Sequence, residues 1–270
     1  MEDKAVLGGA PPSYSEASGG ASARPLQTNF TSLSLHFGDK LRMLRFPHIA
    51  QSVVREIVST TWPGGLQREQ DYHGAYELKL RGYPWMSQGV DAVTSRQLMN
   101  RILAALYELG WVLTLSTDVS KIIGDLDTLL FRYQTAAPTR RDWMAISFSN
   151  GDQIRFIWDH LRGTKPAIVD DYIVALGGAV QRHEPHRAPG CYEIKIIGYP
   201  WRASHGDTNI HARVLLLQLL TTLEMNGWTV YASVDQKEQS GSNNSARGDT
   251  DTWHCCREVG WTPGMPVYHH

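Results

Sequence analysis

The chain has little cysteine, and this scarcity excludes one class of protein. Its 270 residues include only Cys191, Cys255 and Cys256. Three cysteines, two of them adjacent, are too few and too awkwardly placed for the disulfide framework of a small secreted protein. The composition therefore favours a reducing compartment, and we expect a cytoplasmic protein.

Long apolar runs and an excess of charge are also missing. No stretch approaches the roughly 18–20 apolar residues that a membrane-spanning helix needs, and the first twenty residues lack the apolar core of a signal peptide. Lys and Arg total 26 and Asp and Glu 27, a net charge of −1. Without a cationic excess, attraction to nucleic acid is weak. We expect neither a membrane span nor a nucleic-acid partner.

The familiar catalytic signatures are absent as well. The sequence contains no GxSxG elbow, no GxxxxGK[ST] loop and no GxGxxG turn. It therefore lacks the motifs that usually indicate a hydrolase, a nucleotide triphosphatase or a dinucleotide-binding protein. The sequence favours a protein that is not an enzyme and needs no cofactor, while catalysis stays an open alternative.

What the chain does contain is an internal repeat. Residues 76–85 read YELKLRGYPW and residues 192–201 read YEIKIIGYPW, with seven of ten positions identical. Alternating apolar residues predict a strand with one buried face, which ends at Pro84 or Pro200 because proline cannot donate to a ladder. An offset of 117 positions then maps one apolar helical stripe onto another: Leu98, Met99, Ile102, Leu103 and Leu106 onto Leu215, Leu216, Leu219, Leu220 and Leu223.

The remaining pattern gives each repeat the order ββαβαββ. Hairpins are predicted at 32–46 and 145–158, the second turning at Asn150-Gly151, and helices at 46–59 and 166–177. Gly110 and Gly227 are predicted to end the long helices in a left-handed conformation. The fold class is α+β, with helices on one face of a mainly antiparallel sheet. The two units lie side by side about a pseudo-twofold axis or share a single continuous sheet.

Four segments follow from this organisation. Residues 1–28 form a tail that is rich in Gly, Ala, Ser and Pro, and we expect this tail to be disordered. Residues 29–138 are the first α+β repeat, residues 139–262 the second, and residues 263–270 a short C-terminal tail.

The tail carries Pro11-Pro12-Ser13-Tyr14, which resembles the PPxY ligand motif of WW domains. In that motif the two prolines favour a polyproline II helix and the tyrosine fills a neighbouring pocket. The resemblance implies that Pro11, Pro12 and Tyr14 bind a WW-domain protein, as in adaptors that recruit HECT-type ubiquitin ligases.

Acidic residues recur near the last hairpin of each repeat, at Asp118, Asp125 and Asp127 and at Asp235, Asp249 and Asp251. Two carboxylates two residues apart on a loop can bind a hard cation such as Mg²⁺. Aspartate is also a favoured turn residue because its side chain caps backbone N–H groups. Turn chemistry is the favoured interpretation, so no metal site is predicted. The weak metal candidates are Asp125, Asp127, Asp249 and Asp251.

Histidines and thiols supply a second candidate constellation. His183 and His186 with His254, Cys255 and Cys256 have ligand types that suit zinc, but the spacing matches no familiar finger and the first repeat has no counterpart. Cys255 as a nucleophile needs a base, and successive strand residues such as His254 point to the opposite face. We expect structural thiols instead.

The repeated exit from the strand is the candidate interaction surface of the folded part. It comprises Tyr83, Pro84, Trp85, Tyr199, Pro200 and Trp201. Amphipathic aromatics serve as hot spots of protein interfaces, although matched positions in a duplicated unit are more often filled by core residues.

Three functional hypotheses remain. The first is a non-catalytic cytosolic adaptor whose tail binds a WW-domain protein and whose tandem domain binds another partner. The second is a small-ligand or lipid-binding module with an apolar groove between sheet and helices or between the units. The third is a metal-dependent enzyme built on the duplicated Asp clusters. The partner of the folded domain, an unknown protein or a small ligand, cannot be read from the sequence.

Overall fold

The computed structural model describes residues 29–117, 125–136, 138–202, 207–236 and 251–267. The PPxY residues Pro11, Pro12 and Tyr14, together with Asp118 and Asp249, lie outside these described residues. None of the helices in the described ranges has the length and apolar content that crossing a membrane requires.

The first repeat contains six strands, two helices and a short 3₁₀ turn. In chain order these are β1 (Phe30–His36), β2 (Lys40–Leu44), α1 (His48–Thr61), β3 (Leu66–Tyr72), β4 (Ala75–Leu80), η1 (Pro84–Met86), α2 (Gly89–Glu108), β5 (Trp111–Thr117) and β6 (Asp125–Tyr133).

The second repeat follows the same order with one more 3₁₀ turn. Its elements are β7 (Arg141–Ser149), β8 (Gln153–Trp158), α3 (Ile168–Leu176), η2 (Gly177–Ala179), β9 (Val180–Pro185), β10 (Cys191–Ile196), η3 (Pro200–Arg202), α4 (Asp207–Met225), β11 (Trp228–Val234) and β12 (Thr252–Glu258).

Each repeat forms its own six-stranded antiparallel sheet. Sheet 1 has the order β3-β4-β2-β1-β6-β5 and sheet 2 the matching order β9-β10-β8-β7-β12-β11. The tandem α+β repeat is thus confirmed, with two sheets and not one continuous sheet. The duplicated decapeptide supplies β4 and β10, which lie second from one edge of their sheets.

The unit contains one strand more than the predicted ββαβαββ order. The missed strands are β3 and β9, the outer edges of the two sheets. β3 reads LQREQDY and is exposed along most of its length, and β9 is exposed at every position after Val180. A strand that buries no face has no apolar alternation to reveal it.

Local turn chemistry follows the sequence closely. Asn150 and Gly151 turn the β7–β8 hairpin with left-handed φ values of 53° and 84°, in a three-residue connection between the paired residues Ser149 and Gln153. Gly110 and Gly227 leave α2 and α4 at φ values of 86° and 77°, which confirms their predicted role. A Cβ on Gly227 would also lie 2.2 Å from the ring of Trp261.

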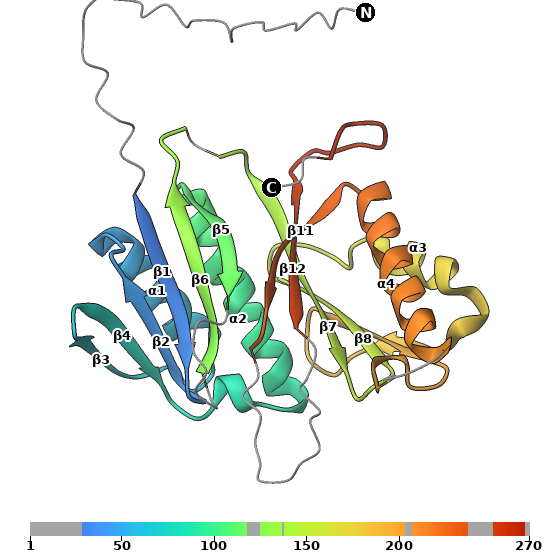
Figure 1. Cartoon of the computed structure of the whole chain (residues 1–270), viewed down its shortest axis with the longest axis horizontal. Coiled ribbons are helices and arrows are strands. Elements are labelled where there is room, and N and C mark those ends of the chain that lie inside the picture. Colours follow the sequence, from blue (N-terminus) through green and yellow to red (C-terminus); the bar gives the residue numbers. More distant parts are fainter. Residues whose placement is uncertain (1–28, 118–124, 137, 203–206, 237–250, 268–270) are drawn as a thin grey trace, which may run out of the picture.

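Helix α2 lies between the two sheets, and this position sets the architecture. Figure 1 shows α2 beside sheet 1 and facing β7 and β8, with α3 and α4 on the far side of sheet 2. The layers therefore run sheet 1, α1 with α2, sheet 2, α3 with α4. Sheet 2 is covered on both faces, which explains why Met144–Phe148 of β7 form a continuous buried run and not an alternating one.

Candidate functional site

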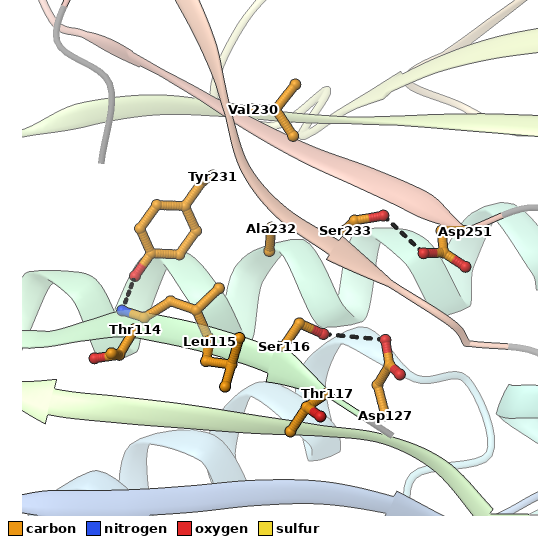
Figure 2. A pocket seen from close by; sticks show the side chains of 11 residues that line it. Thr114, Leu115, Ser116, Thr117, Asp127, Val230, Tyr231, Ala232, Ser233 and Asp251 are labelled. Atoms are coloured by element: carbon orange, nitrogen blue, oxygen red, sulfur yellow. Dashed lines mark hydrogen bonds between the residues drawn. The ribbon is translucent and has the colours of Figure 1, made fainter. Parts of the chain in front are cut away.

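A groove separates the two repeats where their edge strands face each other. β5 and β11 each end the strand order of their own sheet, and the hollow between them has a volume of about 420 Å³. Figure 2 shows its lining, which comes from both repeats. The lining residues are Leu113, Thr114, Leu115, Ser116, Thr117, Asp127, Val230, Tyr231, Ala232, Ser233 and Asp251.

Matched irregularities shape this groove. The β5–β6 register shifts between Leu113 and Leu115, and the β11–β12 register shifts between Val230 and Ala232. The bulged residues are thus Thr114 and Tyr231, which occupy equivalent positions in the two repeats. A bulge bends its strand and redirects side chains, and both bulged residues line the groove.

Hydrogen bonds between described residues connect the repeats across the groove. The backbone N–H of Leu113 donates to the hydroxyl of Tyr231 over 2.6 Å, and the backbone N–H of Asp235 donates to Oδ2 of Asp127 over 2.8 Å. Tyr231 is buried, and this burial raises the pKa of its hydroxyl. The hydroxyl therefore stays protonated and neutral at physiological pH.

A hydroxyl and a carboxylate are paired on each side of the groove. Ser116 Oγ donates to Asp127 Oδ2 over 3.0 Å, and Ser233 Oγ donates to Asp251 Oδ2 over 2.8 Å. These pairs occupy equivalent positions and are both visible in Figure 2. The groove therefore offers hydroxyl groups and two carboxylates to a bound molecule.

The weak metal candidates are only partly assembled at this groove. Asp127 and Asp251 line it, Asp125 is the first residue of β6, and Asp249 lies outside the described residues. Among the residues that the structure describes, no three His, Cys, Asp or Glu side chains gather closely enough to hold a metal ion. Each described carboxylate of the groove bonds to a serine hydroxyl, and Asp127 also accepts a backbone N–H.

The repeated Tyr-Pro-Trp exits divide between surface and core. Trp85 is buried and its indole donates to the carbonyl of Lys40, while the half-buried Trp201 donates to the carbonyl of Gln153. Pro84 and Pro200 are buried as well. Tyr83 and Tyr199 are 66% and 63% exposed, so the tyrosines are the part of this candidate surface that a partner can reach.

The histidine and cysteine candidates do not come together. His183 is exposed on β9, whereas His254 is buried on β12 and contacts Oδ1 of Asn100 on α2. Cys255 packs in the core of the second repeat, on the strand face opposite His254. Burial raises the pKa of Cys255 and of Cys256, the latter to about 11, so these thiols are protonated near neutral pH.

Another hollow, of about 520 Å³, lies on the first repeat at α1, β3 and β4. Its polar centre is Glu69, whose Oε2 accepts from the Tyr76 hydroxyl over 2.6 Å and from Arg55 Nε over 2.8 Å. These bonds lower the pKa of Glu69. The inter-repeat groove is the stronger candidate because equivalent residues of both repeats converge there.

The sequence pattern indicated the aspartates of the groove but not the serines that donate hydrogen bonds to them. Ser116 and Ser233 stand in matched positions of the two predicted strands, and this signal was available. Tyr231 stands opposite Thr114 in the alignment of the repeats, so duplication gave no hint of its role. The position of the Tyr231 side chain follows from the bulge in β11, and no pattern in the sequence predicts that bulge.

One protein-family model, described only as a domain, matches the chain over residues 29–132 and 142–256. The two stretches coincide with the two structural repeats. No curated protein and no solved structure matches the chain. The matched stretches cover most of the chain, and the protein belongs to the family that this domain model defines.

Proposed function

We propose that the protein is a non-catalytic adaptor whose N-terminal segment binds a WW-domain protein, such as a HECT-type ubiquitin ligase, and whose folded body binds a second partner. The observation that carries the proposal is the Pro11-Pro12-Ser13-Tyr14 sequence. Residues 15–29 separate this motif from β1 in the sequence.

The inter-repeat groove supports a second binding site. Edge strands pair with a neighbour on one side only, and an extended segment can add to such an edge through its backbone. Asp127 and Asp251 place negative charge beside the β5 and β11 edges. The occupant that fits this chemistry is an extended peptide segment carrying a Lys or Arg side chain.

Binding of a small polar solute in the same groove is the second candidate function. A volume of about 420 Å³ falls within the range of roughly 300–1,000 Å³ that is usual for small-molecule sites. Hydroxyl and carboxylate groups line the groove, which favours a polar solute over a lipid.

Binding of an isolated WW domain from a HECT-type ligase to the full chain tests the adaptor proposal. We expect micromolar affinity in a calorimetric titration, and at least about a tenfold loss in Tyr14→Ala because the tyrosine pocket is left empty. Tyr83→Ala, an exposed tyrosine of the folded body, is the control and should bind as the wild type does. Equal affinity of Tyr14→Ala and wild type would refute the tail's role.

A photoreactive amino acid at Leu115, which is 51% exposed in the groove, tests the second site in cells. We expect a cross-link to one basic protein segment, absent when the same group replaces Leu161, which is 75% exposed and does not line the groove. Native mass spectrometry of the purified protein separates the alternatives, because a retained low-mass adduct identifies a small solute. Bare protein with no groove-specific cross-link would contradict both.

A further inference from the structure

Helix α4 presents an apolar stripe to solvent. Ile210, Val214 and Leu217 are 61%, 50% and 63% exposed and follow one another at the helical spacing of one face. The other face of α4 carries Leu215, Leu219 and Leu223, which are buried against sheet 2. This helix therefore fills its own core and leaves a second apolar face without cover from the described residues.

The equivalent stripe of α2 is an interface. Val93, the counterpart of Ile210, is 1% exposed and packs in one cluster with Ala145, Ile157 and Cys191 of sheet 2. Asn100, the counterpart of Leu217, contacts Nδ1 of His254 through Oδ1 at 3.2 Å. Within the chain, this face of the long helix packs against the next sheet.

Further polar contacts complete this internal interface. Arg96 Nε donates to Thr252 Oγ1 over 3.1 Å. Gln97 Nε2 donates to the carbonyls of Trp158 and Pro189. Arg101 forms a bidentate ion pair with Asp159, at 3.1 and 2.8 Å. We call the sheet 2 surface beneath α2 the docking face, comprising Ala145, Ile157, Cys191, Glu193, Thr252 and His254.

Sheet 1 has the same surface in the same register, and it is open. Ser32 lies between Leu44 and Leu130 on neighbouring strands, as Ala145 lies between Ile157 and His254. The ion pair Arg155–Glu193 of the docking face, at 2.8 Å, recurs on sheet 1 as Arg42–Glu77 at 2.7 Å. The helices of the first repeat cover the opposite side of sheet 1.

Exposure separates the two surfaces. Leu44 on the open face of sheet 1 is 43% exposed, whereas its counterpart Ile157 beneath α2 is 1% exposed. We define the open face as Ser32, Leu44, Ala75, Glu77, Thr128 and Leu130, the counterparts of the docking face. Glu77 is buried, as its counterpart Glu193 is, at 1% and 7% exposed, and the other five residues are half-buried or exposed.

The two surfaces complement each other at two of the matched contacts. The buried polar pair Asn100 and His254 has as its counterparts Leu217 and Leu130, so both members change to apolar together. The apolar pair Val93 and Ile157 becomes Ile210 and Leu44. An apolar pair in place of a polar one needs no hydrogen bond to compensate its burial.

The residues of the arginine contact recur as well. Arg96 Nη1 donates to the carbonyl of Ala92, and its counterpart Arg213 donates in the same way to Asn209. The guanidinium groups are thus held alike on the two helices. The acceptor Thr252 has its counterpart in Thr128 on the open face.

We propose that α4 of one copy docks on the open face of sheet 1 of a second copy, repeating between chains the interface that α2 makes within the chain. Such contact is heterologous, because the two surfaces differ, and each added copy offers a new α4. The ion pair Arg101–Asp159 is not repeated, since Gln218 and Phe46 stand in the equivalent positions. The contact between chains is therefore weaker than the one within the chain.

Sedimentation velocity of the full chain over a range of concentrations tests the proposal first. The weight-average mass should rise continuously with concentration, past the mass of a dimer, because a heterologous contact leaves both ends open. A mass of 30.3 kDa at every concentration up to the millimolar range would overturn the proposal, and so would a plateau at the dimer mass.

Two charge-introducing variants test which surfaces meet. Leu217→Arg blocks α4 and Leu44→Arg blocks the open face, and both residues are exposed, so neither change disturbs a core. Each variant alone should stay monomeric, while an equimolar mixture should form one-to-one dimers, since each partner supplies the surface that the other lacks. Thermal unfolding like that of the wild type verifies that both variants are folded.

Other outcomes of the mixing experiment discriminate further. Self-association of Leu44→Arg that matches the wild type would indicate an α4 to α4 contact and overturn the proposal. Monomers in the mixture would do the same. The double variant Leu217→Asn/Leu130→His recreates the pair used within the chain, and it should associate at least about tenfold more tightly than Leu217→Asn alone.

Discussion

Single residues, more than whole elements, connect the two repeats at the groove. Tyr231 belongs to the second repeat, yet it packs with the core of the first and accepts the backbone N–H of Leu113. Its ring also meets the rings of Tyr107 and Trp143 edge to face, at 5.8 and 4.9 Å between centroids. One bulged residue therefore carries both an aromatic and a polar contact between the repeats.

Removal of the Tyr231 hydroxyl should destabilise the protein. In Tyr231→Phe the ring contacts remain, but the Leu113 N–H loses its acceptor, at a cost of about 1–2 kcal/mol in the free energy of unfolding. Urea denaturation monitored by tryptophan fluorescence measures the difference. Tyr83→Phe, at an exposed site, is the control and should change stability by less than about 0.5 kcal/mol. Equal stability of the two variants would exclude the proposed role.

His254 makes the interface between α2 and sheet 2 sensitive to acid. Burial, assisted by the nearby positive charge of Arg96, lowers the pKa of His254 to about 3. An exposed histidine titrates near pH 6.5. As the pH falls from about 6.5 toward 3, the unfolded chain binds a proton that the folded chain does not. The contribution of His254 to the free energy of unfolding is therefore constant above about pH 6.5 and decreases as the pH falls below that value.

This titration should cost about 2 kcal/mol of stability between pH 7 and pH 5. The double variant Asn100→Leu/His254→Leu replaces the pair by the leucines found at Leu217 and Leu130, and its stability should fall less over that range by the same amount. Burial also lowers the pKa of His186, and this contribution remains in the variant. Urea denaturation at pH 5 and pH 7 gives the comparison. Identical pH dependence in both proteins would show that His254 is protonated in the fold.

At the scale of elements, the two long helices share one design but differ in surroundings. Leu215, Leu219 and Leu223 of α4 are buried as the apolar stripe predicted, and so are their counterparts on α2. Leu220 is 41% exposed, whereas its counterpart Leu103 is fully buried. The mapped stripe thus predicted correctly the helix face that packs on its own sheet. It was wrong at Leu220, because α2 is covered by both sheets whereas α4 packs on sheet 2 alone among the described residues.

Matched substitutions on the two helices should separate these surroundings. Val93→Asp places a charge in the apolar contact with sheet 2, and we expect a loss of more than about 3 kcal/mol of stability. Ile210→Asp changes the equivalent position of α4, which is exposed, and should alter stability by less than about 0.5 kcal/mol. Thermal or urea unfolding of the two proteins provides the measurement. Comparable losses would mean that α4 is covered as α2 is.

The sequence predicted those elements whose signal is local or duplicated. The Asn150-Gly151 turn and the two helix-ending glycines carry their own backbone requirement, and the repeated apolar stripes mark both long helices. The edge strands β3 and β9 were not predicted, because most of their residues are exposed and show no apolar alternation. The groove was only partly predicted, because it depends on the bulges at Thr114 and Tyr231 and on the stacking of the repeats. These are tertiary features that leave no pattern in the sequence.

At the scale of the molecule, the cores of the two repeats are not independent. The core of the first repeat includes four residues of the second repeat, Tyr231, Ala232, Val234 and Cys256. Helix α2 packs against both sheets. Arg101 and Asp159 add an ion pair between the repeats. A chain with two repeats and two sheets should therefore unfold as one unit, because opening one repeat exposes the covered surface of the other.

Differential scanning calorimetry tests most directly the central claim that α2 joins the repeats into one cooperative body. It is done at a concentration low enough to keep the chain monomeric. A single transition, with a calorimetric enthalpy equal to the van't Hoff enthalpy, is the predicted result. Two resolved transitions, or a calorimetric enthalpy near twice the van't Hoff value, would contradict it and show that the repeats fold separately.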